Sequence, residues 1–324
     1  MSVGATPTHT RRLRLPRAGL HLLLVVAALG VVLALLAVES PFFFKTNNLI
    51  NVANQSAMLA ILATGMTVVM VGGGIDLSLP ANMALAGIIG SMAMVGADSV
   101  WLGALVMVVC GAAVGALNGF AVARLSMIPF VVTLATMTVC GGLSIWLTNS
   151  VSISNQPERF FDVMLSRPLG LPVAVWVMVA VAILIQGVMS ASRFGWQVYA
   201  VGTNPAAARI SRVPVRWVLF KTYVLAGTLA GVAAVVVTAR LGSASANVGN
   251  DSVILDVVTA CVIGGVSIYG GVGRPVAAAL GALFVLVLGN VLNLFGISFF
   301  IGLMVKGAII IAFVALDRAM GGKG

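Results

Sequence analysis

Apolar blocks, each near the length of a membrane-spanning helix, follow one another along almost all of this sequence. An α-helix needs about 20 mostly apolar residues to cross the hydrocarbon core of a bilayer. Charged residues make up only 8% of the chain, against about 25% in a soluble domain. The sequence therefore predicts an all-α, polytopic integral membrane protein with about ten transmembrane helices and Gly-rich breaks. The blocks are Leu22–Val38, Val52–Val71, Ala81–Gly96, Trp101–Ala123, Phe130–Leu147, Val173–Met189, Trp217–Ala239, Val253–Ile268, Val276–Leu294 and Ile297–Leu316.

The basic residues predict how the chain is oriented. A single transmembrane domain is expected over residues 21–318, after a basic arm at 1–20 and before a tail at 319–324. With both termini in the cytoplasm, 13 of the 18 Lys and Arg residues fall on cytoplasmic segments and four on the outer side, while Lys306 lies within a span. This asymmetry follows the positive-inside rule. The net charge of +10 is therefore interpreted as a topology signal, and no nucleic-acid partner is expected.

The longest polar stretch between the spans, residues 191–216, carries a short-helix signal. Asn204 is a favourable N-cap, because its side-chain oxygen accepts a bond from a free N–H of the first turn. Pro205 suits the first helical position, and Pro214 ends the helix. A helix this short is marginal in water, so we expect it to pack under its own chain and to dock into a partner. The predicted segment is Asn204, Pro205, Ala206, Ala207, Ala208, Arg209, Ile210, Ser211 and Arg212.

Two glycine-rich stretches, Gly72–Pro80 and Gly264–Pro275, interrupt the apolar pattern. Glycine and proline do not continue a helix comfortably, and non-helical backbone at membrane depth needs protein or a wet cavity around it. The first stretch is either a break beside a solute pathway or a tight turn in which Asp76 caps the next helix. Paired breaks in two halves of a membrane protein point to transporter architecture.

Polar residues inside or beside the spans are the candidates to line a pathway. They are Asp76, Ser78, Asn118, Thr133, Thr136, Asn290 and Asn293. Uncharged ones also suit plain hydrogen bonds between helices. Lys306 is different, since a charge within a span is by default a functional candidate whose partner has to be named. Asp256 is the predicted partner, and a purely structural salt bridge is the alternative.

Small residues repeat at four-residue spacing in two spans, at Gly111, Gly115 and Gly119 and at Gly227 and Gly231. Such faces let helix backbones approach closely. We interpret both as packing faces.

Residues 148–172 form the only long segment on the predicted outer side. This segment is expected to pack as a short surface helix or to form a lip around a mouth, and a plain solvated linker is the alternative.

Residues for chemical catalysis are few. The only histidines are His9 and His21, at the N-terminal edge, so no His-based triad or HExxH motif exists. The sequence also has no GxxxxGK[ST] phosphate loop. We therefore expect no catalytic residue, no metal site and no cofactor in this chain, and any ATP to be hydrolysed by another subunit.

The ordered motifs resemble the ribose-type permease family, the membrane subunits of bacterial ATP-binding-cassette importers for simple sugars. The resemblance covers the chain from about Asn51 to its end and departs from the family at Leu79–Ala81, where the family usually carries a small-residue continuation. The matching stretches are GGGIDLS (72–78), GALNGFAVARL (115–125), FVVTLATMTVCGGL (130–143), FGWQVYAVGTNPAAARISRVPV (194–215), SVILDVVTACVIGGVSIYGGVGR (252–274) and the tail 288–318.

This resemblance implies a permease homo- or heterodimer in the inner (plasma) membrane of a bacterium. Its partners would be two cytoplasmic ATP-binding-cassette subunits, which bind ATP and Mg²⁺, and a periplasmic or lipid-anchored solute-binding protein. Residues 204–212 match the coupling helix that sits in a cleft on the ATPase. An ATPase-independent secondary transporter or channel for a small polar solute is the alternative. An intramembrane enzyme and a purely structural subunit are the remaining competitors.

Overall fold

The structure is a bundle of long apolar helices. The computed structural model describes residues 27, 30, 41–298, 300–309 and 311. Within these residues seven helices are long and apolar enough to cross a membrane, and two shorter apolar helices cover Ser252–Ile263 and Phe300–Ile309. The predicted first span, Leu22–Val38, lies almost wholly outside the described residues, and so does the end of the last. The predicted fold class, an all-α polytopic membrane protein, is confirmed.

The bounds of the helices follow the predicted blocks closely. In chain order they are η1 (Pro41–Phe44), α2 (Thr46–Val71), α3 (Leu79–Gly96), α4 (Val100–Ala123), α5 (Pro129–Thr148), α6 (Glu158–Met164), η2 (Pro168–Gly170), α7 (Val173–Ala191), α8 (Arg193–Thr203), α9 (Pro205–Ile210), α10 (Val215–Leu241), η3 (Ala246–Gly249), α11 (Asp251–Ile263) and α12 (Pro275–Leu294).

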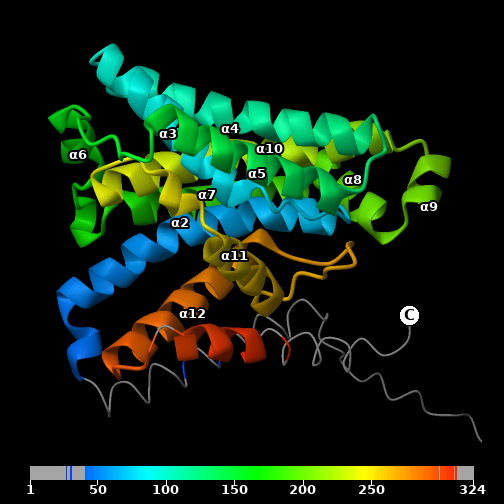
Figure 1. The fold of residues 1–324 in the computed structure, drawn as a ribbon. Helices are drawn as coiled ribbons and strands as arrows, with labels where there is room; N and C mark the ends of the chain where they lie inside the picture. The colour runs from blue at the N-terminus through cyan, green and yellow to red at the C-terminus, as the bar shows by residue number, and fades with distance from the viewer. Residues whose placement is uncertain (1–26, 28–29, 31–40, 299, 310, 312–324) are drawn as a thin grey trace, which may run out of the picture.

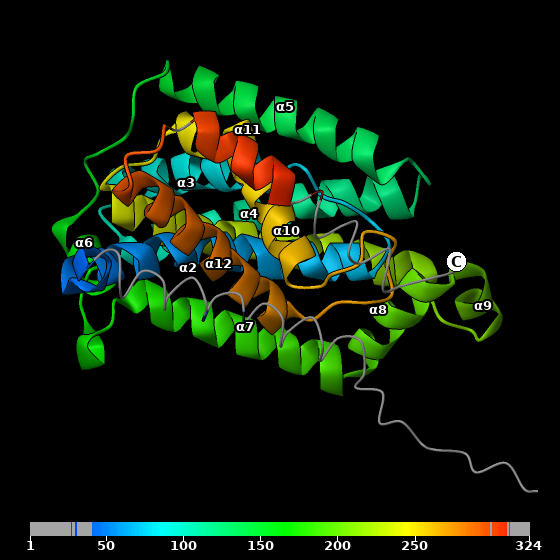
Figure 2. The ribbon, with the colours of Figure 1, turned by 90° about the horizontal axis from the view of Figure 1, so that it is seen from below.

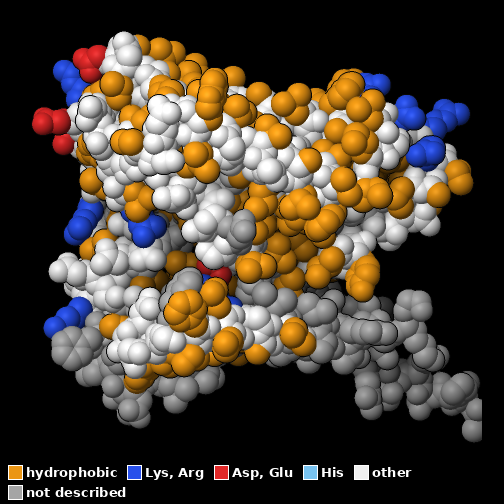
Figure 3. All heavy atoms as spheres, in the orientation of Figure 1, with side chains coloured by type: hydrophobic (Ala, Val, Ile, Leu, Met, Phe, Trp, Pro, Cys, Tyr) orange, Lys and Arg blue, Asp and Glu red, His pale blue; other side chains and the backbone are white. Residues whose placement is uncertain are grey.

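The bundle has two ends, one marked by α6 and the other by α9 (Figure 1). Seen from below, α5 and α7 run along opposite sides, and α2, α4, α10 and α12 lie between them (Figure 2). In the most apolar 18-residue stretch of α2, 83% of the residues are buried, whereas the share is 22% in the corresponding stretches of α5 and α7. On the face shown in Figure 3, basic and acidic side chains gather towards the two ends, and hydrophobic side chains cover much of the surface between them. This is the surface that a bilayer requires.

Glycines bring α4 and α10 into close contact. A Cβ atom on Gly111 would meet the backbone of Gly227 and Gly231, and one on Gly115 would lie 3.0 Å from the Cα of Gly227. Backbones that approach this closely gain dispersion contacts that larger side chains would prevent. The interpretation of these glycines as packing faces is confirmed.

The two glycine-rich breaks begin with the same backbone motif. After α2, the Gly73 N–H bonds to the carbonyl of Met70, and the Gly74 N–H to that of Val69. After α11, Gly265 and Val266 repeat this pattern on Val262 and Cys261. Gly73 and Gly265 have φ of 85° and 74°, the left-handed conformation that a Schellman motif requires.

The motif at the second break also explains an error in the prediction. The expected span Val253–Ile268 was too long, because α11 ends at Ile263. The left-handed turn at Gly265 stops the helix although the sequence stays apolar beyond it.

The predicted long segment 148–172 contains a short helix, α6, and is more than a solvated linker. The Phe160 side chain of α6 is 1% exposed, and the Gln156 amide donates to Ser91 Oγ at 3.2 Å. A buried aromatic ring and a cross-helix bond fix this segment on the end of the bundle.

Candidate functional site

The predicted short helix exists and is largely exposed. Asn204 Oδ1 accepts bonds from the backbone N–H groups of Ala206 and Ala207, each at 3.0 Å. Only Ala208 of this helix is buried, and Ile210 is 85% exposed. The other exposed members of the predicted segment are Asn204, Pro205, Ala206, Ala207, Arg209, Ser211 and Arg212. A six-residue helix that presents an apolar tip and Arg209 to its surroundings, with Arg212 just beyond its end, has the features of a docking element.

The helix α8, which carries α9, rests against both glycine-rich breaks. Gly271 N donates to the carbonyl of Val71 at 2.9 Å, and a Cβ on Gly202 would overlap that oxygen. The Tyr199 hydroxyl donates to the Gly273 carbonyl at 2.6 Å. Burial raises the pKa of Tyr199, so its hydroxyl remains a donor. Three segments far apart in the sequence therefore meet at one junction made mainly of backbone.

Five of the seven predicted pathway residues form one buried hydrogen-bonded cluster. Asp76 Oδ1 accepts from Ser78 Oγ at 2.6 Å, and Asn118 Nδ2 donates to Ser78 Oγ at 2.8 Å. Thr136 Oγ1 donates to Asn118 Oδ1 at 2.6 Å, and Thr133 Oγ1 to the carbonyl of Ile75 at 3.4 Å. The cluster thus ties the α2–α3 break to α4 and α5.

The alternatives for Asp76 both find support in its geometry. Its carboxylate also accepts from the backbone N–H of Ser78 at 3.0 Å, directly before α3, as a turn-stabilising residue would. However, Asp76 is 1% exposed and bonds to Asn118 of another helix, which a plain surface turn would not require. Asp76 Oδ2 has no hydrogen-bond partner among the described residues. The break is therefore an internal part of the bundle.

The other two pathway candidates, Asn290 and Asn293, lie apart from this cluster. They line a cavity of about 210 Å³ between α2, α11, α12 and the Phe300–Ile309 helix. Figure 3 shows the molecule hollowed between the body of the bundle and α12. Neither this cavity nor the crevice described below is lined by any residue of the Asp76 cluster. The cavity is lined by Val52, Gln55, Asp256, Val285, Leu286, Gly289, Asn290, Leu292, Asn293, Ile297, Ser298, Gly302, Leu303 and Lys306.

The predicted pairing of Lys306 with Asp256 is confirmed, and the pair lines this cavity. Lys306 Nζ lies 2.8 Å from one carboxylate oxygen of Asp256 and 3.1 Å from the other. The side chains are 21% and 22% exposed, so the pair is partly screened. Two opposite charges leave the wall of the cavity without net charge.

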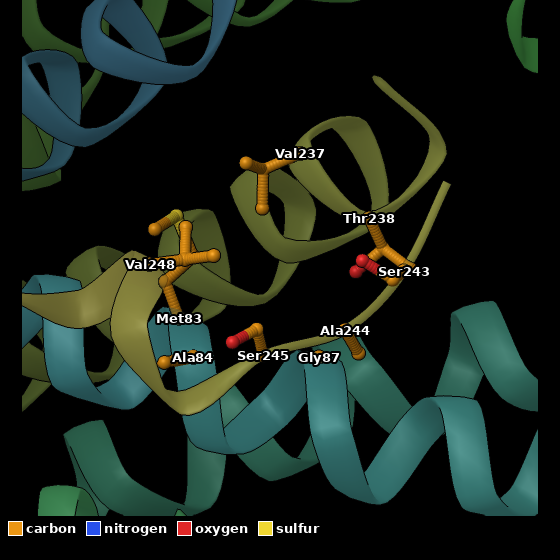
Figure 4. A pocket seen from close by; sticks show the side chains of 9 residues that line it. All are labelled: Met83, Ala84, Gly87, Val237, Thr238, Ser243, Ala244, Ser245 and Val248. Carbon is orange, nitrogen blue, oxygen red and sulfur yellow. The ribbon is translucent and has the colours of Figure 1, made fainter. Parts of the chain in front are cut away.

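A second, much smaller crevice lies between α3, α10 and the segment before η3 (Figure 4). Its volume is about 10 Å³, near the space that one water molecule needs. Thr238 and Ser245 bring hydroxyl groups to it. The crevice suits a bound water and is too small for a solute. Among the residues that the structure describes, no group of three His, Cys, Asp or Glu side chains comes together for a metal ion.

Three residues at these sites were not predicted from the sequence: Asn48, Gln55 and Tyr199. Asn48 and Asn290 exchange two amide hydrogen bonds, each of 3.0 Å, beside the cavity that Gln55 lines. The sequence contained a signal, since Asn48 and Gln55 stand seven residues apart around the start of the predicted span Val52–Val71. Such spacing places polar groups on one helix face. Tyr199 had no comparable signal in the sequence.

The fold and these sites define a class of protein. Paired helix breaks at a shared junction, a polar cavity among apolar helices and an exposed short helix are the features of a transport permease. The chain belongs to the family described as "Branched-chain amino acid transport system / permease component", whose model matches residues 48–314.

Curated relatives agree with this class. The ribose import permease protein RbsC of Escherichia coli (strain K12) is 36% identical over 90% of this chain and 92% of that protein. The protein of the same name from Bacillus subtilis (strain 168) is 36% identical over 90% of both chains. The D-allose transport system permease protein AlsC of Escherichia coli (strain K12) is 32% identical over 90% of this chain and 89% of that protein. No solved structure matches the chain significantly.

Proposed function

We propose that this chain is the membrane-spanning permease of an ATP-binding-cassette importer for a simple sugar or related polyol. The relatives named for ribose and D-allose each align with 90% of the chain, and the family model spans residues 48–314, which include α9, the Asp76 cluster and the larger cavity. The long apolar helices make the chain a multi-pass membrane protein. The basic residues favour an orientation in which α9 and both termini face the cytoplasm.

The single observation that carries the ATPase part of this proposal is the exposure of α9. Its N-terminus is capped by Asn204, yet Ile210 is 85% exposed at its far end. Exposed apolar residues rimmed by charge are typical of protein contact sites. In the proposed complex, α9 is the coupling helix, and Arg209 and Arg212 bond to acidic or carbonyl groups of the ATPase.

The proposed assembly contains a permease homo- or heterodimer, two ATPase subunits that bind ATP and Mg²⁺, and a solute-binding protein outside the inner membrane. ATP-driven closure of the ATPases would move α9, and α8 would pass this movement to the two breaks through the junction at Gly202. The loaded binding protein would favour one of two helix packings and ATP the other.

The Asp76 cluster has a proposed role in the pathway. Its bonds link the α2–α3 break to α4 and α5 through Asn118 and Thr136. Movement at the junction would therefore reach groups that a polyol can bond to. Asp76, Ser78, Asn118, Thr133 and Thr136 are proposed as one part of the pathway, and Asn290 and Asn293 as another.

A second candidate solute is a branched-chain amino acid. The description of the matching family names this class, and the cavity combines an ion pair with apolar walls. The sugar is favoured, because the curated relatives are named for sugars and because a zwitterion would have to separate Lys306 from Asp256 to bind both. An ATPase-independent transporter is the competing mechanism, and α9 would then have no partner.

The ATPase part is tested with the double variant Ala207→Asp, Arg209→Glu, expressed together with the ATPase subunits of the proposed complex. It should insert normally and bind the ATPase about tenfold or more weakly, a loss of at least ~1.4 kcal/mol. Arg159→Glu, an exposed charge reversal on α6 at the opposite end, is the matched control. Undiminished co-purification of the ATPase with the double variant would contradict the proposed role of α9.

The solute is tested in cells that express this chain with the ATPase and the binding protein of the proposed complex. Uptake of labelled D-ribose, D-allose and L-leucine is compared with and without depletion of ATP. The proposal expects ATP-dependent uptake of a sugar. Uptake of leucine alone would support the second candidate, and uptake of a sugar that survives ATP depletion would support the competing mechanism.

A further inference from the structure

The 210 Å³ cavity occupies one half of the bundle. Of α12 it includes residues from Val285 to Asn293, the half nearer the α6 end, and of α2 it includes Val52 and Gln55 near the start. Asn293 and Ser298 are exposed where α12 ends, whereas the side chains of the Asp256–Lys306 pair are 21% and 22% exposed. The cavity thus lies in the half of the bundle away from α9 and joins exposed residues at the end of α12 to a less exposed ion pair.

Two amide side chains that line this cavity have no hydrogen-bond partner among the described residues. Gln55 and Asn293 make no side-chain hydrogen bond within the part of the chain that the structure describes, although both line the cavity. Asn290 differs, because its amide oxygen and one of its N–H groups are already bonded to Asn48. Gln55 is half-buried and Asn293 is exposed, so water satisfies both amides when no solute is bound. These two amides are therefore available to a polar molecule in the cavity.

The ion pair limits the net charge of a molecule that can bind in the cavity. Lys306 Nζ bonds both oxygens of Asp256, so each charge is already neutralised. A hydroxyl group can accept from the ammonium or donate to the carboxylate without separating them. An ion would have to pull the pair apart and leave one charge unpaired, which is costly away from water. The pair therefore favours a neutral solute with several hydroxyl groups.

The size and the remaining walls limit the solute further. The cavity volume of about 210 Å³ compares with the roughly 10–15 Å³ that holds one water molecule on the same measure, so the cavity has room for one small ring. Val52, Leu286 and Leu303 supply an apolar side. A sugar ring has both an edge of hydroxyl groups and faces of C–H groups, and it fits a wall of each kind.

We propose that this cavity is the entry site for one neutral, polyhydroxylated ring, bound by Gln55 and Asn293 near the mouth and by the Asp256–Lys306 pair at the inner end. This inference rests on the proposed function, in which the end opposite α9 receives the solute. It adds the site, its residues and the exclusion of charged solutes.

Binding is tested by cysteine protection in the full-length chain, purified and reconstituted in lipid nanodiscs. Gln55→Cys is labelled with a water-soluble maleimide with and without D-ribose, D-allose or L-leucine. The labelling of the native cysteines, measured on the wild-type chain, is subtracted. A sugar at about ten times its Kd should slow the labelling about tenfold, since an occupied cavity does not react. Asn51→Cys is the control, because Asn51 lies one turn away on α2, is exposed and does not line the cavity.

Each outcome of this experiment decides for or against the site. Protection of Gln55→Cys by a sugar, with Asn51→Cys unaffected, supports it. Equal rates with and without every sugar, or protection by leucine alone, overturn it. If Gln55→Cys does not fold, Asn293→Cys at the mouth replaces it under the same expectations.

Uptake in cells separates this inference from the proposed function. Gln55→Leu and Asn293→Leu should each raise the KM for sugar uptake about tenfold, a loss of ~1.4 kcal/mol of binding, while Asn51→Leu leaves it unchanged. Sugar uptake at the wild-type KM in both variants would overturn the entry site and leave the proposed function intact. Absence of ATP-dependent sugar uptake by the wild-type system would overturn the proposed function, whatever the protection assay shows.

Discussion

Adding one methyl group at Gly202 should uncouple α9 from the rest of the bundle. The new Cβ would overlap the Val71 carbonyl oxygen and lie 2.7 Å from Gly271 N. Both neighbours are backbone atoms that are hydrogen-bonded to each other. Neither atom can therefore move away by a side-chain rotation. Overpacking of this kind costs about 1–3 kcal/mol, and replacing a helical glycine by alanine returns about 0.5–1 kcal/mol. We expect Gly202→Ala to be destabilised by a net ~1–2 kcal/mol.

The control is Gly187→Ala on α7, where no atom lies within 4 Å of the added Cβ. This variant gains the helix propensity without a clash, so it should be stabilised by about 0.5–1 kcal/mol. Thermal unfolding of the purified chains should therefore place the melting temperature of Gly202→Ala a few degrees below that of Gly187→Ala. ATP-dependent uptake should fall in Gly202→Ala only. Equal melting temperatures and equal uptake in the two variants would refute the reasoning about this junction.

Two further predictions concern the cap of α9 and the intramembrane ion pair. Asn204→Ala should lose about 1 kcal/mol of helix stability and Asn204→Ser almost none, so binding of the ATPase should weaken about fivefold in the first variant only; equal binding by both would contradict a role for the cap. Lys306→Met should destabilise the chain by about 3 kcal/mol, near the lower end for a buried pair because the side chains are partly exposed. Adding Asp256→Asn should recover at least ~1 kcal/mol in thermal or denaturant unfolding, and strict additivity of the two substitutions would argue against the pair.

The positions of the spans were predictable because each depends on a local property. A run of apolar residues of membrane length, with a proline near its start as at Pro129 and Pro275, needs no knowledge of the rest of the fold. The same is true of α9, since Asn204 caps N–H groups only two and three residues away. The end of α11 was missed because the left-handed glycine that stops it lies inside an apolar run.

The grouping of the polar residues was not predictable in the same way. Asn118 bonds to Asp76, 42 positions away, and Asn290 bonds to Asn48, 242 positions away. Such pairings depend on how helices pack, which periodicity within one helix does not reveal. The pairing of Lys306 with Asp256 was the exception, because so few charges lie within the spans that the choice of partners was small.

The matching ends of α2 and α11 have a consequence for how the bundle moves. Each helix closes its last turn with hydrogen bonds from its own chain, which satisfy carbonyl groups that a helix end otherwise leaves free. Among the backbone hydrogen bonds of the described residues, only that from Gly271 to Val71 crosses between the two break segments. Relative movement of the two break segments would therefore cost this single backbone bond, besides side-chain contacts between α2 and α11 such as that of Cys261 Sγ with the Ala63 carbonyl, and the hydrogen bonds that close each helix end would stay intact.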